Sequence, residues 1–92
     1  VNINNITTGI VVTTSLNDLK VYPNPTNGDV TISNNFIITN ITIVTVTGKQ
    51  VYRMDNLAQK QINISLKNYS KGIYYVKVQG GNQVEVIKLV KQ

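Results

Sequence analysis

The chain has 92 residues, the size of one small domain, and it contains neither cysteine nor histidine. These absences exclude disulfides, thiol nucleophiles, imidazole bases and the triads built on them, and they remove the usual zinc and copper ligands. Nine Lys and Arg against four acids give a net charge of +5, which favours an anionic partner. The cations are spread evenly along the chain, so nucleic acid is not expected as that partner. We expect a module that is not an enzyme and needs no cofactor or metal.

The first 15 residues are uncharged and rich in Thr and Asn, which is typical of a linker or of the end of an upstream region. Within them, residues 10–13 are compatible with a short strand. From Leu16 the pattern changes, and we expect the folded domain to span residues 16–92. The chain has no starting Met, no signal peptide and no apolar run that would span a membrane. We therefore expect it to be a piece of a longer protein whose export signal lies upstream.

Runs of Thr, Ile, Val and Tyr alternate with polar residues and predict strands, while Asn and Gly mark the turns between them. In chain order, the expected strands are residues 19–22, 29–33, 41–47, 50–54, 61–66, 73–79 and 84–90. Asn34-Asn35 is expected to end the second strand. Seven strands without a helix predict an all-β fold, an antiparallel β-sandwich.

The turns carry the residues with special backbone requirements. Between the first two strands, Pro23 and Pro25 fix φ, Asn24 is expected to cap its own turn, and Gly28 is expected to supply a positive φ. Thr47-Gly48-Lys49 and Gly80-Gly81-Asn82 predict tight hairpin turns.

Alternation assigns the strand faces. Val30 and Ile32 are expected to point one way, Ile41 and Ile43 to lie on one face of their strand, and Val51 and Leu66 to face the core. The side chains expected to share one core between the two sheets are Ile62, Ile64, Tyr74, Val76 and Val78. Tyr75 is expected to face away from that core. The last strand is apolar on both faces, with Val84 and Val86 on one and Ile87 and Leu89 on the other. This predicts burial on both sides or a bulge that changes the register.

Four motifs stand in a fixed order. Val21-Tyr22-Pro23-Asn24-Pro25 leads to Gly28, Val46-Thr47-Gly48-Lys49 leads to Val51, Gly72-Ile73-Tyr74 opens a strand, and the chain ends in Val86-Ile87-Lys88-Leu89-Val90-Lys91-Gln92. This ordered set resembles the C-terminal sorting domain of type IX secretion substrates of Bacteroidetes, in its YPNPxxG type. The resemblance covers residues 16–92.

The resemblance implies an Ig-like β-sandwich at the C-terminus of a larger cargo. It implies a non-catalytic signal that directs the cargo from the periplasm through the outer-membrane type IX translocon, so that the cargo is secreted or held at the cell surface. A sortase-like surface peptidase would normally remove the domain and join the cargo to anionic lipopolysaccharide. The implied partners are thus the translocon components and this peptidase.

The resemblance also supplies the candidate sorting residues. They are Tyr22, Pro23, Asn24, Pro25, Gly28, Gly48, Lys49, Gly72, Tyr74, Lys88, Leu89, Val90 and Lys91. The turn residues and Tyr74 are also explained by turn chemistry and core packing. The terminal strand is the strongest candidate, with its lysines expected in water. Its backbone edge is a second means of recognition, and it is also a route to a weak homodimer.

An alternative is an accessory β-sandwich of a secreted enzyme, either a carbohydrate-binding module or a spacer. Such a sugar-binding face usually presents a row of exposed aromatic rings. Tryptophan is absent, and Tyr52, Tyr69 and Tyr75 are the candidates for that row.

Overall fold

The computed structural model describes residues 19–92, and these form seven strands and no helix. The strands are β1 (Lys20–Tyr22), β2 (Asp29–Ile38), β3 (Asn40–Thr45), β4 (Gln50–Met54), β5 (Gln59–Ser65), β6 (Gly72–Gly80) and β7 (Gln83–Lys91). All seven predicted strands are thus confirmed, with ends that differ by a few residues. The expected linker at residues 1–15, the short strand at residues 10–13 and the domain start at Leu16 lie outside the described residues.

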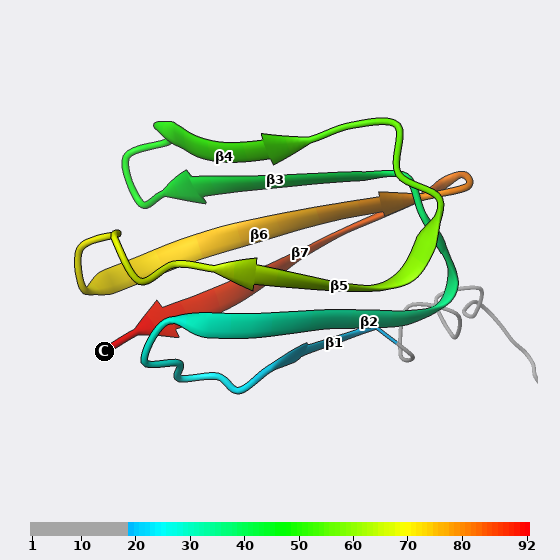
Figure 1. Ribbon diagram of the computed structural model, residues 1–92. Coiled ribbons are helices and arrows are strands. Elements are labelled where there is room, and N and C mark those ends of the chain that lie inside the picture. Colours follow the sequence, from blue (N-terminus) through cyan, green and yellow to red (C-terminus); the bar gives the residue numbers. More distant parts are fainter. Residues whose placement is uncertain (1–18) are drawn as a thin grey trace, which may run out of the picture.

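The strands form two antiparallel sheets that pack face to face (Figure 1). One sheet has the order β1-β2-β5, and the other has the order β4-β3-β6-β7. As in immunoglobulin-type sandwiches, the first, second and fifth strands share one sheet, and the third, sixth and seventh share the other. The predicted all-β sandwich is confirmed.

The two inner faces form a single apolar core. Its buried side chains are Val30, Ile32, Ile38, Ile41, Ile43, Ile62, Ile64, Leu66, Tyr74, Val76, Val78 and Leu89. Val51 is half-buried and packs against this core from β4. Period-two alternation therefore assigned the inner faces of β2, β3, β5 and β6 correctly, because each of these strands buries one face and leaves the other toward solvent. In β4 the adjacent Val51 and Tyr52 both pack against the core, beside a register shift in the pairing with β3.

The expected end of the second strand at Asn34-Asn35 is wrong. β2 continues to Ile38, and its pairing with β5 shifts register between Ser33 and Ile38. An irregularity of this kind absorbs residues that do not fit the ladder without ending the strand. Asn34 and Asn35 therefore mark the shift in pairing.

The chain crosses from one sheet to the other just after β2. Ile38 pairs with Gln59 of β5, whereas Asn40 pairs with Gln79 of β6. Gly80 lies beside this crossing, and a Cβ atom on it would stand 2.5 Å from the carbonyl oxygen of Ile37. Only glycine leaves room for so close an approach of two backbones.

Both expected hairpin turns are present. Gly48 has a φ of 90° in the β3–β4 turn, and Gly81 has a φ of 59° in the β6–β7 turn. These are left-handed conformations that glycine adopts without a steric penalty.

The expectation for the last strand is wrong in both of its forms. β7 pairs with β6 in one continuous register from Gln83 to Lys91, without a bulge. Its inner face carries the buried Leu89, but Val84 and Val86 on the outer face are 47% and 56% exposed. β7 is thus an edge strand with one apolar face open to water.

Candidate functional site

The loop between β1 and β2 lies against the end of β7. Asn24 Nδ2 donates to the carbonyl oxygen of Lys88 at 2.7 Å, and Asn24 Oδ1 accepts from the amide N–H of Val90 at 3.0 Å. The side-chain amide thus imitates a peptide group and pairs with β7 as a neighbouring strand would. The expectation that Asn24 caps its own turn is wrong, because both of its polar atoms bind a strand more than sixty residues away.

Thr26 extends this contact and is 1% exposed. Its N–H donates to the carbonyl oxygen of Val90 at 2.9 Å, and its carbonyl oxygen accepts from the N–H of Gln92 at 2.8 Å. These bonds form an isolated parallel bridge between Thr26 and Lys91. The loop therefore covers the last residues of β7 on the side that faces away from β6.

The Thr26 hydroxyl holds the loop in shape. Oγ1 donates to the carbonyl oxygen of Asp29 at 2.6 Å and accepts from the N–H of Gly28 at 3.0 Å. The sequence analysis missed Thr26 because it occupies one of the two unspecified positions of the PNPxxG motif. The available signal was a hydroxyl side chain between proline and glycine, where such groups often bond to nearby backbone.

Gly28 does not have the expected positive φ. It is buried, and a Cβ atom there would stand 2.8 Å from Cγ of Lys67. Packing space therefore explains this glycine. Pro23 and Pro25 both follow cis peptide bonds, and both are exposed, as is Tyr22 at the end of β1.

The terminal strand divides its candidate residues between two faces. Leu89 and Lys91 face the interior, opposite Tyr74 and Gly72 of β6, whereas Lys88 is exposed and Val90 is half-buried. The expectation that both lysines lie in water is wrong for Lys91, which is 8% exposed. Its aliphatic stem is covered while Nζ reaches the carbonyl oxygen of Gln92 at 3.5 Å.

Tyr74 joins the terminal strand to the β5–β6 loop. Its ring is buried, and its hydroxyl donates to the carbonyl oxygen of Ser70 at 2.6 Å. The Tyr69 ring lies 6.1 Å from the Tyr74 ring, and the Tyr69 hydroxyl donates to the carbonyl oxygen of Val51 at 3.0 Å. These contacts connect β4, β6 and the loop before β6.

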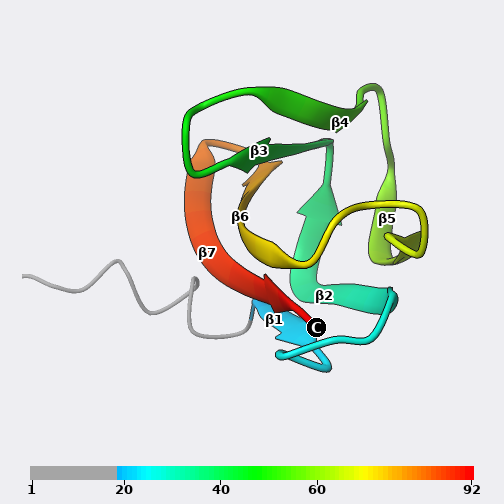
Figure 2. The same cartoon turned by 90° about the vertical axis from the view of Figure 1, so that its left-hand side faces the viewer.

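All four motifs meet at one end of the sandwich. The β1–β2 loop, the exposed Gly48-Lys49 turn, the start of β6 and the C-terminus lie together at the left in Figure 1, and this end faces the viewer in Figure 2. The structure thus brings the candidate residues to one end. There the β1–β2 loop bonds to β7, β7 pairs with β6, and the Tyr69 hydroxyl links the loop before β6 to Val51 of β4.

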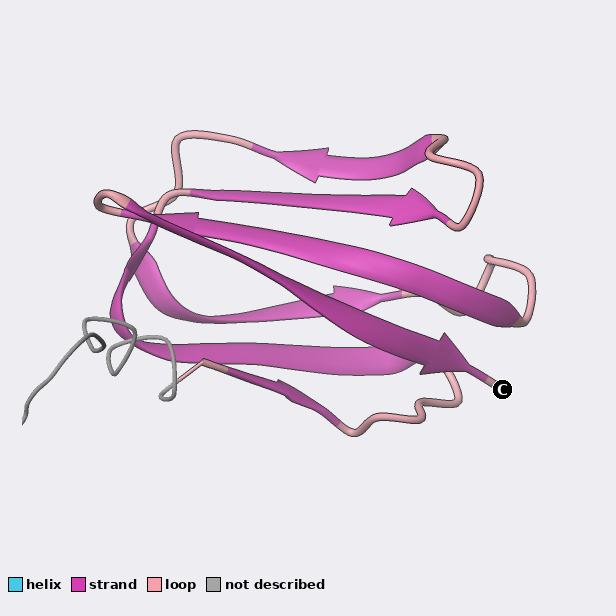
Figure 3. Ribbon diagram, turned by 180° about the vertical axis from the view of Figure 1, so that it is seen from behind, coloured by secondary structure: helices cyan, strands magenta, loops and turns pink. Residues whose placement is uncertain are grey.

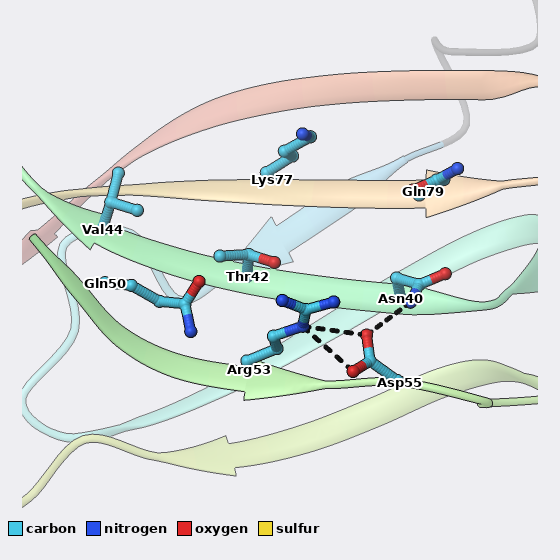
Figure 4. Close-up of a pocket in the computed structure, with 8 residues that line it drawn as sticks. All are labelled: Asn40, Thr42, Val44, Gln50, Arg53, Asp55, Lys77 and Gln79. Atoms are coloured by element: carbon cyan, nitrogen blue, oxygen red, sulfur yellow. Dashed lines mark hydrogen bonds and ion pairs between the residues drawn. The ribbon is translucent and has the colours of Figure 1, made fainter. Parts of the chain in front are cut away.

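A shallow polar hollow of about 310 Å³ lies elsewhere, on the outer face of the four-stranded sheet (Figure 4). It is lined by Asn40, Thr42, Val44, Gln50, Arg53, Asp55, Lys77 and Gln79. Arg53 Nε donates to both oxygens of Asp55, at 3.1 and 3.0 Å, and Asn40 Nδ2 donates to Asp55 at 2.6 Å. No aromatic ring lines this hollow.

The three tyrosines proposed for a sugar-binding row do not share a face. Tyr52 and Tyr69 pack against the core, whereas Tyr75 lies on the outer face of β6 opposite Val44 and Lys88. They therefore cannot stack along one carbohydrate chain.

The hydrogen bonds from Asn40 and Arg53 lower the pKa of Asp55 below its usual value of 3.8. The stability contributed by these contacts is therefore present above that value and is lost as the pH falls through the lower folded-state pKa. We expect wild-type protein to lose slightly more stability than Asp55→Asn between pH 7 and acidic pH. Urea unfolding at a series of pH values would measure this. Identical acid sensitivity of both proteins would contradict the assigned contacts.

Within residues 19–92, no cluster of acidic side chains could hold a metal ion. The same part of the chain contains no helix long and apolar enough to cross a membrane.

The fold, together with the four motifs at one end of it, defines a class of protein. It is a small β-sandwich module in which the β1–β2 loop binds the end of the last strand. The chain belongs to the family described as the secretion system C-terminal sorting domain, whose model matches residues 20–92. The family is a type IX secretion signal and is non-catalytic. The resemblance seen in the sequence is therefore confirmed.

A solved structure shares the fold. It is that of PorZ, described as an essential bacterial surface component of the type-IX secretion system of human oral-microbiomic Porphyromonas gingivalis. The TM-score is 0.65 at 20% identity, and the match covers 86% of this chain and 12% of that chain. This chain thus spans a small part of the PorZ length. No curated protein matches the sequence.

Proposed function

We propose that this domain directs a larger cargo from the periplasm through the outer-membrane type IX translocon, as a recognition signal without catalysis. The observation that carries the proposal is the meeting of the PNPxxG loop with the terminal strand through Asn24 and Thr26. Antiparallel pairing places the end of β3, the start of β6 and the end of β7 at the same end of the sandwich. The bonds of Asn24 and Thr26 add the PNPxxG loop to them, so the four motifs offer the translocon a single surface.

We further propose that the domain begins near Leu16 and that residues 1–15 connect it to the cargo. A sortase-like surface peptidase then removes the domain and joins the cargo to anionic lipopolysaccharide, or the cargo is released. Family membership supports this sequence of steps.

The test fuses the 92-residue chain to a periplasmic reporter in a type IX-competent strain. We expect the reporter on the cell surface or in the medium, and we expect a fusion that starts at Leu16 to behave in the same way. The matched control is the same fusion in a strain that lacks the translocon, where the reporter should stay in the periplasm. Retention of the reporter in the competent strain would refute the proposal.

A further inference from the structure

β7 is the least protected edge among the described strands. The four edges are β1 with 3 residues, β4 with 5, β5 with 7 and β7 with 9. The pairing of both β4 and β5 with their neighbours is interrupted by a register shift, whereas that of β7 is continuous. Proteins usually shield long edges with bulges, prolines or charges, because an open edge recruits another strand.

The direction of the backbone groups of β7 follows from its bonds to the loop. The carbonyl of Lys88, both groups of Val90 and the N–H of Gln92 face the loop, away from β6. In an antiparallel ladder, alternate residues turn their N–H and C=O to the same side. Val84 and Val86 therefore also turn theirs outward. No strand or loop within residues 19–92 pairs with them there.

The loop thus closes only half of this edge. It covers Lys88 to Gln92 and leaves the stretch from Val84 to Val86 open. Figure 3 shows β7 from behind, where it runs along the margin of its sheet toward the C-terminus. A strand added to this edge could pair with β7 only as far as Lys88, because Asn24 already occupies the carbonyl of Lys88 and the N–H of Val90.

The side chains beside the open edge suggest the chemistry of a partner. Val84 and Val86 are exposed on the outer face, whereas the exposed Ile73 of β6 stands opposite Val90, at the end of β7 that the loop covers. Lys77 stands directly opposite Val86, and Lys88 follows Val86 on the same face. The open edge is therefore apolar and bordered by two cations.

We propose that the Val84–Val86 edge binds an extended segment of the export machinery by strand addition. That segment places apolar side chains beside the two valines and an acidic side chain near Lys77 and Lys88. Main-chain hydrogen bonds supply affinity, and the flanking side chains supply specificity. The inference rests on the proposed function, since it specifies how the export machinery recognises the terminal strand. A second copy of this chain fits less well, because each copy carries a net charge of +5.

The decisive variant is Val86→Pro. The Val86 N–H points away from β6, so proline removes an edge donor without removing a bond of the β6–β7 ladder. The matched control, Val86→Ile, keeps both the N–H and an apolar, branched side chain. We expect surface export of the reporter fusion to fall about tenfold for Val86→Pro and to stay within about twofold for Val86→Ile.

Circular dichroism and urea unfolding establish that the variants are folded. If Val86→Pro is unfolded, Val84→Pro tests the same edge, since its N–H also points outward. Lys88→Glu should lower export by up to about fivefold, and Lys88→Arg should retain it.

Three results would overturn this inference. The first is normal export by a folded proline variant. The second is a wild-type dimer, measured by analytical ultracentrifugation, that Val86→Pro converts to a monomer, because the edge would then serve a second copy. The third is equal export by Lys88→Glu and Lys88→Arg, which would remove the acidic partner residue. Failure of the wild-type fusion to leave the periplasm would instead refute the proposed function.

Discussion

Replacing Leu89 with alanine is expected to lower the free energy of unfolding by about 2–5 kcal/mol. Leu89 is 0% exposed, and it lies opposite Tyr74 in the ladder between β7 and β6. The substitution removes buried methyl groups and leaves a cavity that the surrounding strands fill only in part. Because a small domain has only about 5–15 kcal/mol of stability, this is a large share of the total. Urea unfolding followed by circular dichroism would measure it.

The same strand offers a matched control on its other face. Val86→Ala also shortens an aliphatic side chain of β7, but Val86 is 56% exposed and should change stability by only about 0.5 kcal/mol. Equal destabilisation by the two substitutions would show that the faces of β7 are assigned incorrectly. Leu89→Met, which nearly conserves volume, should cost less than about 1.5 kcal/mol.

Much of the sandwich could be predicted because its signals are local. Ile62 and Ile64 in β5, and Tyr74, Val76 and Val78 in β6, alternate with polar or outward residues, and all five are buried. In a strand with one buried face, apolar and polar residues alternate, since neighbouring side chains point to opposite sides. The sequence alone therefore shows which side chains face the core. The hairpin turns were equally readable, because few residues besides glycine adopt the φ of Gly48 and Gly81.

The predictions for the end of β2 and for the faces of β7 were wrong because both depend on strands far away in the sequence. Asn34-Asn35 has the composition of a turn, but the pairing of β2 with β5 continues on both sides of it. In β7, alternation shows that both faces are apolar. It does not show that one of them stays uncovered, because that depends on which strands stand beside it.

The candidate site was predicted as a set of residues but not as an arrangement. The PNPxxG loop and the terminal strand are more than sixty residues apart along the chain. Only the fold shows that Asn24 and Thr26 bind the backbone of Lys88, Val90 and Gln92. A side-chain amide that bonds to a strand far along the chain leaves no periodic signal.

The burial of Lys91 changes how the terminal charges should be tested. With both lysines in water, as the sequence predicted, reversing their charges would alter only surface electrostatics, but Lys91 is 8% exposed and faces the interior. A carboxylate there would be costly to desolvate, and it would reduce folding and export together. Lys88 is exposed and is therefore the residue at which charge can be tested separately from stability.

Removing the Asn24 side chain is expected to loosen the end of β7 and to reduce export. Asn24→Ala loses the bonds to the Lys88 carbonyl and the Val90 N–H, which together should cost about 1–3 kcal/mol. The local result should be faster hydrogen exchange at the Val90 amide, measured by NMR. If the translocon reads the ordered strand, surface display of the reporter fusion should fall as well.

Two further variants separate the contributions of the loop. Asn24→Asp keeps an acceptor for the Val90 N–H but sets an oxygen against the Lys88 carbonyl, so it should protect the Val90 amide better than Asn24→Ala does. Asn27→Ala changes an exposed asparagine of the same loop and should leave both exchange and export unchanged. Unaltered exchange at Val90 in Asn24→Ala would mean that Thr26 alone holds the strand. Normal export by a variant whose strand end has loosened would mean that the translocon does not require the ordered form.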